Sequence, residues 1–191
     1  MERRTVMMAA TAAATSLALL SGCTTNKGAS ETPAQKMAAI DTGADATLAT
    51  LYSSVPGSRE LAAKSSGILV FPKIYAAGLG IGGEYGEGAL KVGSATVGYY
   101  RTSSLTFGFQ AGAQSKALVM MFMTQEALDK FRNSKGWTAG ADASVTVVKS
   151  GAQGTVDTAS ARSAVNAFAL TNSGLMAGVT IDGTKVSKLE F

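Results

Sequence analysis

The stretch from Gly67 to Met123 constrains the fold most, because it is unusually rich in glycine. Eleven of the chain's 22 glycines fall between Gly67 and Gly112, and the residues between them are mostly β-branched, aromatic or small. Leu105, Phe107 and Phe109 alternate with small or polar residues, a period of two that is typical of a half-buried strand. Glycine inside strands marks bulges and sharp bends. Its repetition along successive strands indicates a sheet that curves strongly enough to close.

Short strands recur along the rest of the chain, with few helices between them. This pattern predicts an α+β protein that is mainly β, with a small antiparallel, glycine-rich β-barrel core and about three helices packed on its surface. The segment 118–123 is apolar on both faces and predicts a central or helix-covered strand, and Asp182-Gly183 predicts a hairpin turn. Strands are expected near residues 68–71, where Pro72 would end the first of them, and near 76–84, 88–92, 95–101, 105–111, 116–123, 143–149, 164–171, 174–182 and 184–190.

The first predicted helix runs from Ala34 to Leu51 and is ended by Val55-Pro56-Gly57. Thr32, Pro33 and Gln35 form a helix start, with a capping threonine, proline at the first position and a glutamine that completes a capping box. Gly43 weakens the helix by up to about 1 kcal/mol. Two interpretations are open, packing on the sheet or lying on a membrane surface. Packing is favoured, because the only cation on the polar face is Lys36 and it faces two acids, Asp41 and Asp45.

Two shorter helices are expected, one at 58–64 and one at 124–134. Thr124 caps the latter, Leu128 and Phe131 form its buried side, and Lys135-Gly136 closes it.

Residues 1–22 have the features of a bacterial lipoprotein signal peptide. Arg3 and Arg4 precede an uncharged apolar run that is too short to span a bilayer but fits a secretory signal. Leu20-Ser21-Gly22-Cys23 resembles the lipobox of bacterial lipoproteins, in which the cysteine becomes the mature N-terminus and carries a diacylglycerol. The alternative is an exported protein with a free thiol. Cys23 is the only cysteine and directly follows the apolar run, which favours lipidation.

The chain after the signal divides into a tether and one domain. Residues 23–32 are polar and small, as in a flexible linker, and residues 33–191 are enough for one domain with its own core. Without residues 1–22 the chain keeps 15 basic and 12 acidic side chains. This mild excess of positive charge permits attraction to anionic lipid, and nothing in the chain resembles a nucleic-acid-binding module.

The composition argues against most enzyme classes. There is no histidine, and the only cysteine is assigned to the anchor, which leaves no Ser-His or Cys-His nucleophile and no usual transition-metal ligand set. Residues 78–83 match G-x-G-x-x-G, but a dinucleotide site needs a helix to begin there, and the sequence that follows is a poor helix former. Glu84 and Glu87 could be a glycosidase-like carboxylate pair, but exposed loop carboxylates are common. We therefore expect no catalytic residues, metal or cofactor.

Two groups of basic residues are candidate lipid-headgroup sites. Lys130, Arg132 and Lys135 form the densest group, and Trp137 beside them could be an interfacial aromatic or a core residue. Lys64 and Lys73, on either side of the first strand, are a second candidate.

Four stretches of the chain resemble the SYLF domain family. They are GILVFPKIYAAGLGIGGEYGEG from Gly67, GFQAGAQSKALVMMFMTQEALDKF from Gly108, GWTAGADASV from Gly136 and FALTNSGLMAGVTIDG from Phe168. They occur in one order over nearly all of residues 33–191, and with the lipobox they resemble the bacterial lipoprotein branch of this family.

The resemblance implies a β-barrel core with helices on its surface and no enzymatic activity. Eukaryotic members bind phosphoinositides, through a basic helix near the start of the domain, and a fungal branch binds actin. The expected function is that of a lipoprotein anchored to the outer membrane through Cys23, facing the periplasm of a Gram-negative cell. Its domain would bind anionic phospholipid or phosphoinositide headgroups weakly. The alternative is a structural envelope lipoprotein that docks on a protein partner.

Overall fold

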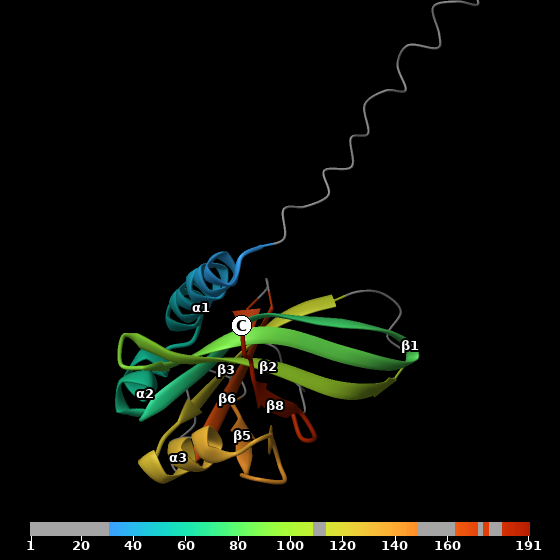
Figure 1. Cartoon of the computed structure of the whole chain (residues 1–191). Coiled ribbons are helices and arrows are strands. Elements are labelled where there is room, and N and C mark those ends of the chain that lie inside the picture. The colour runs from blue at the N-terminus through green and yellow to red at the C-terminus, as the bar shows by residue number, and fades with distance from the viewer. Residues whose placement is uncertain (1–30, 109–113, 149–162, 172–173, 176–180) are drawn as a thin grey trace, which may run out of the picture. The chain divides into compact units, whose positions relative to one another are not determined.

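A computed structural model of the chain describes residues 31–108, 114–148, 163–171, 174–175 and 181–191 (Figure 1). Contacts divide the chain into two units between Thr32 and Pro33. The helices and strands described all lie in the second unit. They are α1 (Pro33–Ser54), α2 (Ser58–Lys64), β1 (Gly67–Val92), β2 (Ala95–Gly108), β3 (Gln114–Phe122), α3 (Gln125–Asn133), β4 (Trp137–Thr138), β5 (Val145–Val147), β6 (Val165–Thr171), β7 (Gly174–Leu175) and β8 (Lys185–Lys188). Among the residues described, no helix combines the length and apolarity needed to cross a bilayer.

The eight strands form one curled sheet in the order β4-β8-β2-β1-β3-β6-β5, with β7 paired to β6. The pairs are antiparallel except that of β5 with β6, which is parallel. An isolated bridge between Ala139 and Ala143 links the segments next to the two outer strands of this order, β4 and β5. The sheet thus curls into a half-barrel. The predicted α+β class, with a curved glycine-rich sheet and three helices, is confirmed.

The long strand β1 doubles back on itself. Residues 67–76 pair with β3, and residues 80–92 pair with β2. A Cβ on Gly88 would lie 2.2 Å from the Val70 carbonyl oxygen, and one on Gly86 would lie 2.8 Å from the Lys73 carbonyl oxygen. Glycine is required at these two positions because a side chain would collide with the first half of the strand. The curvature expected from the glycine content is therefore concentrated in one strand.

The predicted strand boundaries in this region were too short. The strands expected at 68–71, 76–84 and 88–92 are parts of β1, and those expected at 95–101 and 105–111 fall largely in β2. Pro72 does not end a strand; it lies at a register shift between Phe71 and Ile74. Proline cannot donate to a ladder, and the irregularity takes up its missing N–H within a continuous strand.

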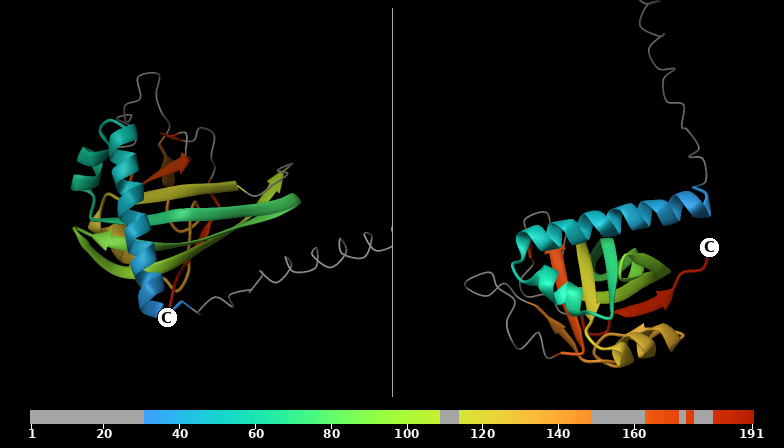
Figure 2. Two further views of the ribbon diagram at one scale, coloured as in Figure 1. Left: turned by 90° about the horizontal axis from the view of Figure 1, so that it is seen from above. Right: turned by 90° about the vertical axis from the view of Figure 1, so that its left-hand side faces the viewer.

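Alternate residues of the central strands face two separate hydrophobic clusters. In β3, Leu118, Met120 and Phe122 join the cluster that includes α3, whereas Val119 and Met121 join the one beneath α1 and α2. Figure 2 shows α1 across one face of the sheet and α3 on the opposite side. Both clusters consist of residues from 33–191, so we expect this part of the chain to fold without the first 32 residues.

The three predicted helices are present, but α3 ends at Asn133 with Ser134 as its C-cap and is not closed by Lys135-Gly136. The last hairpin is also corrected. Helix α2 spans 58–64 as predicted, and the Thr124 hydroxyl caps α3 by accepting a hydrogen bond from the Ala127 N–H at 3.2 Å. Asp182 and Gly183 do form a turn, with φ of 82° at Gly183. However, β8 after this turn pairs with β2 and β4, whereas β7 before it pairs with β6. The two segments that the hairpin was expected to join therefore have different partners.

Gly43 in α1 is explained by a close contact between the helix and the sheet. A Cβ at this position would lie 2.9 Å from Cβ and 3.0 Å from Cγ of Pro72. The proline ring is rigid and lies in a continuous strand, so neither partner can give way easily. The helix thus loses some intrinsic stability at Gly43 but approaches the sheet closely.

We predict that Gly43→Ala destabilises the domain, although alanine is the better helix former. Helix propensity alone would raise the free energy of unfolding by up to about 1 kcal/mol, whereas overpacking typically costs about 1–3 kcal/mol. Chemical denaturation should show a net loss of about 1 kcal/mol. Ala49→Gly, at an exposed position of the same helix, is the matched control and should lose about 1 kcal/mol through propensity alone. A gain in stability for Gly43→Ala would contradict the close approach.

Candidate functional site

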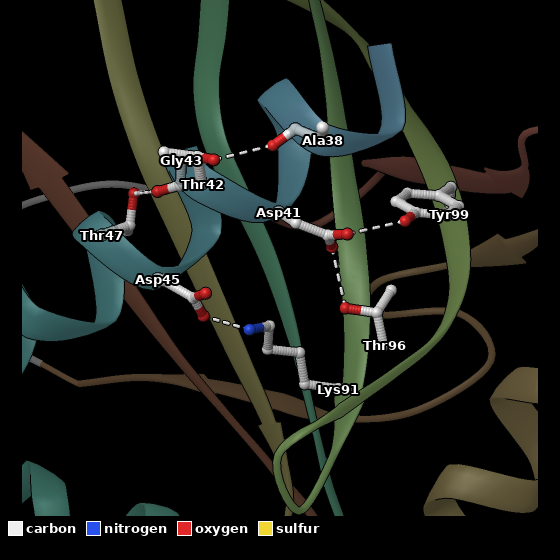
Figure 3. Close-up of polar contacts among 9 residues, drawn as sticks. All are labelled: Ala38, Asp41, Thr42, Gly43, Asp45, Thr47, Lys91, Thr96 and Tyr99. Atoms are coloured by element: carbon white, nitrogen blue, oxygen red, sulfur yellow. Dashed lines mark hydrogen bonds and ion pairs between the residues drawn. The ribbon is translucent and has the colours of Figure 1, made fainter. Parts of the chain in front are cut away.

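The charged side chains of α1 bind the sheet. Figure 3 shows the Asp41 carboxylate accepting hydrogen bonds from the hydroxyls of Thr96 and Tyr99, each at 2.8 Å, and an ion pair between Asp45 and Lys91. Near the start of the helix, Lys36 donates to Glu87 at 2.6 Å. These are the charged residues of the polar face considered above, so the helix packs on the sheet with its charges engaged.

The contact with Asp41 changes the ionisation of Tyr99. Removal of the phenol from water raises its pKa, and the hydrogen bond and negative charge of Asp41 raise it further, to about 12. At Glu87, partial burial would raise the pKa of the carboxyl group, but the hydrogen bonds from Lys36 and Tyr85 outweigh it and hold the pKa below its usual value. The protonated tyrosine and the ionised glutamate thus both stabilise the packing of α1.

A groove of about 590 Å³ lies between the second half of α1 and the sheet. On the helix side, the hydroxyls of Thr47 and Thr50 donate to the carbonyls of Gly43 and Ala46, at 2.8 Å and 3.0 Å. Since each hydroxyl has one hydrogen, these groups can only accept hydrogen bonds from a molecule in the groove. Among the described residues, the lining contains two lysines and no acid: Ala46, Thr47, Thr50, Ser54, Pro72, Lys73, Ser115, Lys116, Ala117, Leu170 and Thr171.

Lys73 is the cation that this groove presents to solvent. Its side chain is exposed, and its ammonium lies 5.4 Å from the centre of the Tyr75 ring. The ammonium of Lys116, by contrast, pairs with Glu84 at 2.8 Å, and both side chains are largely buried. The groove therefore has a net positive charge that comes from Lys73.

The three cations predicted at the end of α3 lie on the opposite side of the sheet from α1 (Figure 2). Lys130, Arg132 and Lys135 are all exposed, and Lys130 pairs with Glu126 at 3.0 Å. The pairing of β4 with β8 adds Lys185, whose Cε would lie 3.3 Å from a Cβ on Gly136. Sequence spacing gave no sign of Lys185, because it is brought there by a strand pair far apart in the chain.

Trp137 is a core residue and is removed from the candidate headgroup ligands. It is only 2% exposed and packs against Phe122 and Phe131, with ring centres at 6.3 Å and 5.7 Å. As the first residue of β4 it faces the cluster beneath α3. A ring enclosed in this way cannot enter a membrane interface, so the α3 cations lack the aromatic partner expected from the sequence.

The cavity next to α3 is less suited to an anion than the groove beneath α1. It has a volume of about 340 Å³, and Glu126 and Asp142 contribute to its lining together with Lys130. Among the described lining residues, two carboxylates against one ammonium disfavour a negatively charged ligand.

The remaining candidates are structural or isolated. Residues 78–83 lie inside β1, so no helix begins at the glycine motif and a dinucleotide site has no support. Glu84 is bound by Lys116 and Ser104 and Glu87 by Lys36 and Tyr85, so both carboxylates hold the fold together. Lys64 is exposed at the end of α2. Cys23 lies outside the described residues. Within those residues, no group of three or more acidic, histidine or cysteine side chains could hold a metal.

Comparison with protein-family models gives a match for residues 103–190. The matched family is Ysc84, described as "Las17-binding protein actin regulator". Residues 103–190 are therefore similar to the SYLF domain family, in agreement with the resemblance found in the sequence. The match begins in β2 and covers somewhat less than half of the chain, including three of the four stretches that carry the resemblance. The matched residues include β3, α3 and the two strands β4 and β8 that bring the cations together. No curated protein matches the chain.

We predict that the Asp41–Tyr99 contact gives the domain a pH-dependent stability at the alkaline end. Because the folded protein holds the proton more tightly, this contribution is fully present below the usual tyrosine pKa of 10.0 and is lost as pH rises to about 12. The phenolate absorbance that disappears in Tyr99→Phe should therefore titrate near pH 12 in the wild type. Asp41→Asn removes the charge but keeps an acceptor, and should lower this midpoint. A wild-type midpoint near 10 for this tyrosine would contradict the contact.

Proposed function

We propose that this protein is a lipoprotein held at the inner face of a Gram-negative outer membrane, where its SYLF domain binds anionic phospholipid headgroups weakly. The match of residues 103–190 to the SYLF family model supports lipid binding in general. The lipobox-like segment that ends at Cys23 supports the anchor, and the absence of histidine from the chain supports a role without catalysis. The anchor provides most of the membrane affinity by raising the local concentration of the domain at the surface.

The observation that carries the headgroup proposal is the groove beneath α1, whose described lining residues include Lys73 and no acid. A phosphate needs hydrogen-bond donors, and the ammonium of Lys73 is a charged donor in reach of solvent. The hydroxyls of Thr47 and Thr50 already donate their hydrogens to backbone carbonyls of the helix. The groove therefore offers few hydrogen-bond donors, and its affinity for a headgroup is low. The α3 cations are the alternative surface. One flat bilayer cannot meet both, because α1 and α3 lie on opposite sides of the sheet.

We predict that Lys73→Gln weakens binding to anionic vesicles about fivefold at low salt, because one cation near such a surface contributes up to about 1 kcal/mol. The measurement is co-sedimentation of residues 24–191, which contain the whole domain but lack Cys23, with vesicles of anionic or neutral lipid. The control is a triple variant that combines Lys130→Gln, Arg132→Gln and Lys135→Gln. It should change vesicle binding less than twofold.

Three outcomes of this experiment are informative. A loss caused by the triple variant, with no effect of Lys73→Gln, would move the site to the end of α3. Equal binding of the wild type to anionic and neutral vesicles at low salt would remove the electrostatic proposal. No binding to either would leave docking on a protein partner as the better function.

We predict that Cys23→Ser releases the protein from the outer membrane without changing its domain. Cys23 lies outside every helix and strand of the domain, so denaturation of the purified domain should not depend on it. Membrane fractionation should find wild type in the outer membrane and the variant elsewhere. Mass spectrometry of wild type should find Cys23 at the mature N-terminus with added acyl mass. An unmodified thiol, or a different mature N-terminus, would overturn the anchor and the location inferred from it.

A further inference from the structure

The paired strands of the sheet extend past α1 and leave one end of its outer face bare. Figure 2 shows α1 crossing only part of the sheet, with the strands continuing beyond it. This extension includes the middle of β1 and the second half of β2. The outer face of the extension, on the side of α1, is called the arm face below and is defined by Lys73, Tyr75, Tyr85, Arg101 and Leu105.

The pleat of the sheet places these five side chains on one face. Ile74, which precedes Tyr75, points inward and belongs to the core cluster. Glu84, which precedes Tyr85, also points inward and binds the largely buried Lys116. Leu105 follows Ser104, which also binds Glu84. Since successive side chains of a strand alternate between faces, Tyr75, Tyr85 and Leu105 point outward together.

These three side chains lie on neighbouring strand segments. Tyr85 pairs with Ser103, and Leu105 pairs with Gly83, so the two side chains are diagonal neighbours across β1 and β2. A Cβ on Gly86 would touch Ile74, so the backbone segments that carry Tyr85 and Tyr75 lie close together across the doubled strand. Tyr75 is 56% exposed, Tyr85 47% and Leu105 75%.

The charges on the arm face are mainly positive. Lys73 lies over the Tyr75 ring, and Arg101 is exposed and stands opposite Glu87 in the pairing of β1 with β2. The acid on this face, Glu87, is already paired with Lys36 of α1. A bare sheet face thus combines amphipathic aromatic rings, an exposed leucine and two cations.

We propose that the arm face is the surface with which the domain rests on a bilayer that carries anionic headgroups. This inference rests on the proposed function and adds an apolar contact to the charge of Lys73. Tyrosine and leucine beside lysine and arginine are the residues that membrane interfaces favour, with rings at headgroup level and cations toward phosphates. Lys73 belongs to both the groove and the arm face, so a headgroup in the groove would bring the arm face to the same bilayer.

The length of chain before the domain permits this orientation. Nine residues, 24–32, separate Cys23 from Pro33, the start of α1, and the ten residue steps between them span at most about 36 Å when extended. Lys36, one turn into α1, contacts Glu87, which also accepts a hydrogen bond from Tyr85. The helix therefore begins close to the arm face, and a chain anchored at Cys23 can place that face on its own membrane.

Tryptophan placed on the arm face should report insertion into lipid. The chain has one tryptophan, Trp137, which is buried on the opposite side of the sheet. Residues 24–191 carrying Leu105→Trp are mixed with anionic vesicles that contain lipids brominated near the headgroup. We expect the fluorescence emission of Leu105→Trp to shift to shorter wavelength. The brominated lipids should also quench at least half of the intensity that the new tryptophan adds to that of the wild type. Wild type, whose tryptophan is enclosed, should lose almost none.

The matched control is Val97→Trp. Val97 is 44% exposed on the same strand, and eight residues of strand place it about 27 Å from Leu105. We expect no quenching at this position. A second variant, Leu105→Ser, should lower vesicle binding up to about tenfold by removing an inserted apolar side chain.

The outcomes separate this inference from the proposed function. If the protein sediments with anionic vesicles but Leu105→Trp is not quenched, the arm face is not the membrane contact although headgroup binding stands. Equal quenching of Val97→Trp would also overturn it. The emission of Leu105→Trp could instead shift in the absence of lipid, to an extent that depends on protein concentration. If sedimentation then shows dimers, the arm face is a contact with a second copy of the chain. If neither the wild type nor any variant binds vesicles, the proposed function itself fails.

Discussion

The structure depends on the close passage of the two halves of β1. At Gly88 the strand runs so near its own first half that a Cβ would lie 2.2 Å from the Val70 carbonyl oxygen. The two halves that meet here have different partners, since residues 67–76 pair with β3 and residues 80–92 pair with β2. Each larger side chain at Gly86 or Gly88 would push the halves apart and separate β2 and β8 from β3 and β6. The glycine content of the sequence is thus a steric requirement of the central strand.

Helix α1 completes this arrangement through polar contacts that differ from those of a typical surface helix. Its apolar side buries Ile40, Ala44 and Leu51 in one hydrophobic cluster, while Asp41 and Asp45 reach over to the sheet. A buried carboxylate or ammonium is tolerated only when it is paired, and Lys91, with its side chain 10% exposed, is paired with Asp45. The helix is therefore fixed in direction as well as packed, which leaves the far part of the sheet uncovered.

Sequence reasoning found the parts of the fold that depend on local patterns. The caps and spacing gave α1, α2 and α3, because a helix is encoded by neighbours three or four residues apart. It failed at Pro72, which lies within a strand, and at the last hairpin, because strand pairing depends on residues far apart in the chain. The candidate cations were found from composition, but Lys185 and the burial of Trp137 follow from the pairing of β4 with β8.

Leu105, in the correctly predicted strand β2, is the most informative residue for function. An alternating pattern predicts that the apolar set faces the core, yet Leu105 is 75% exposed while its neighbour Ser104 faces Glu84. The inner face at this end of the sheet is occupied by the ion pair of Glu84 with Lys116. Polar groups thus lie inside and apolar groups outside, an inversion that is unfavourable in water alone. A surface that meets lipid removes the unfavourable part of this inversion, because there the exposed leucine and tyrosines leave water.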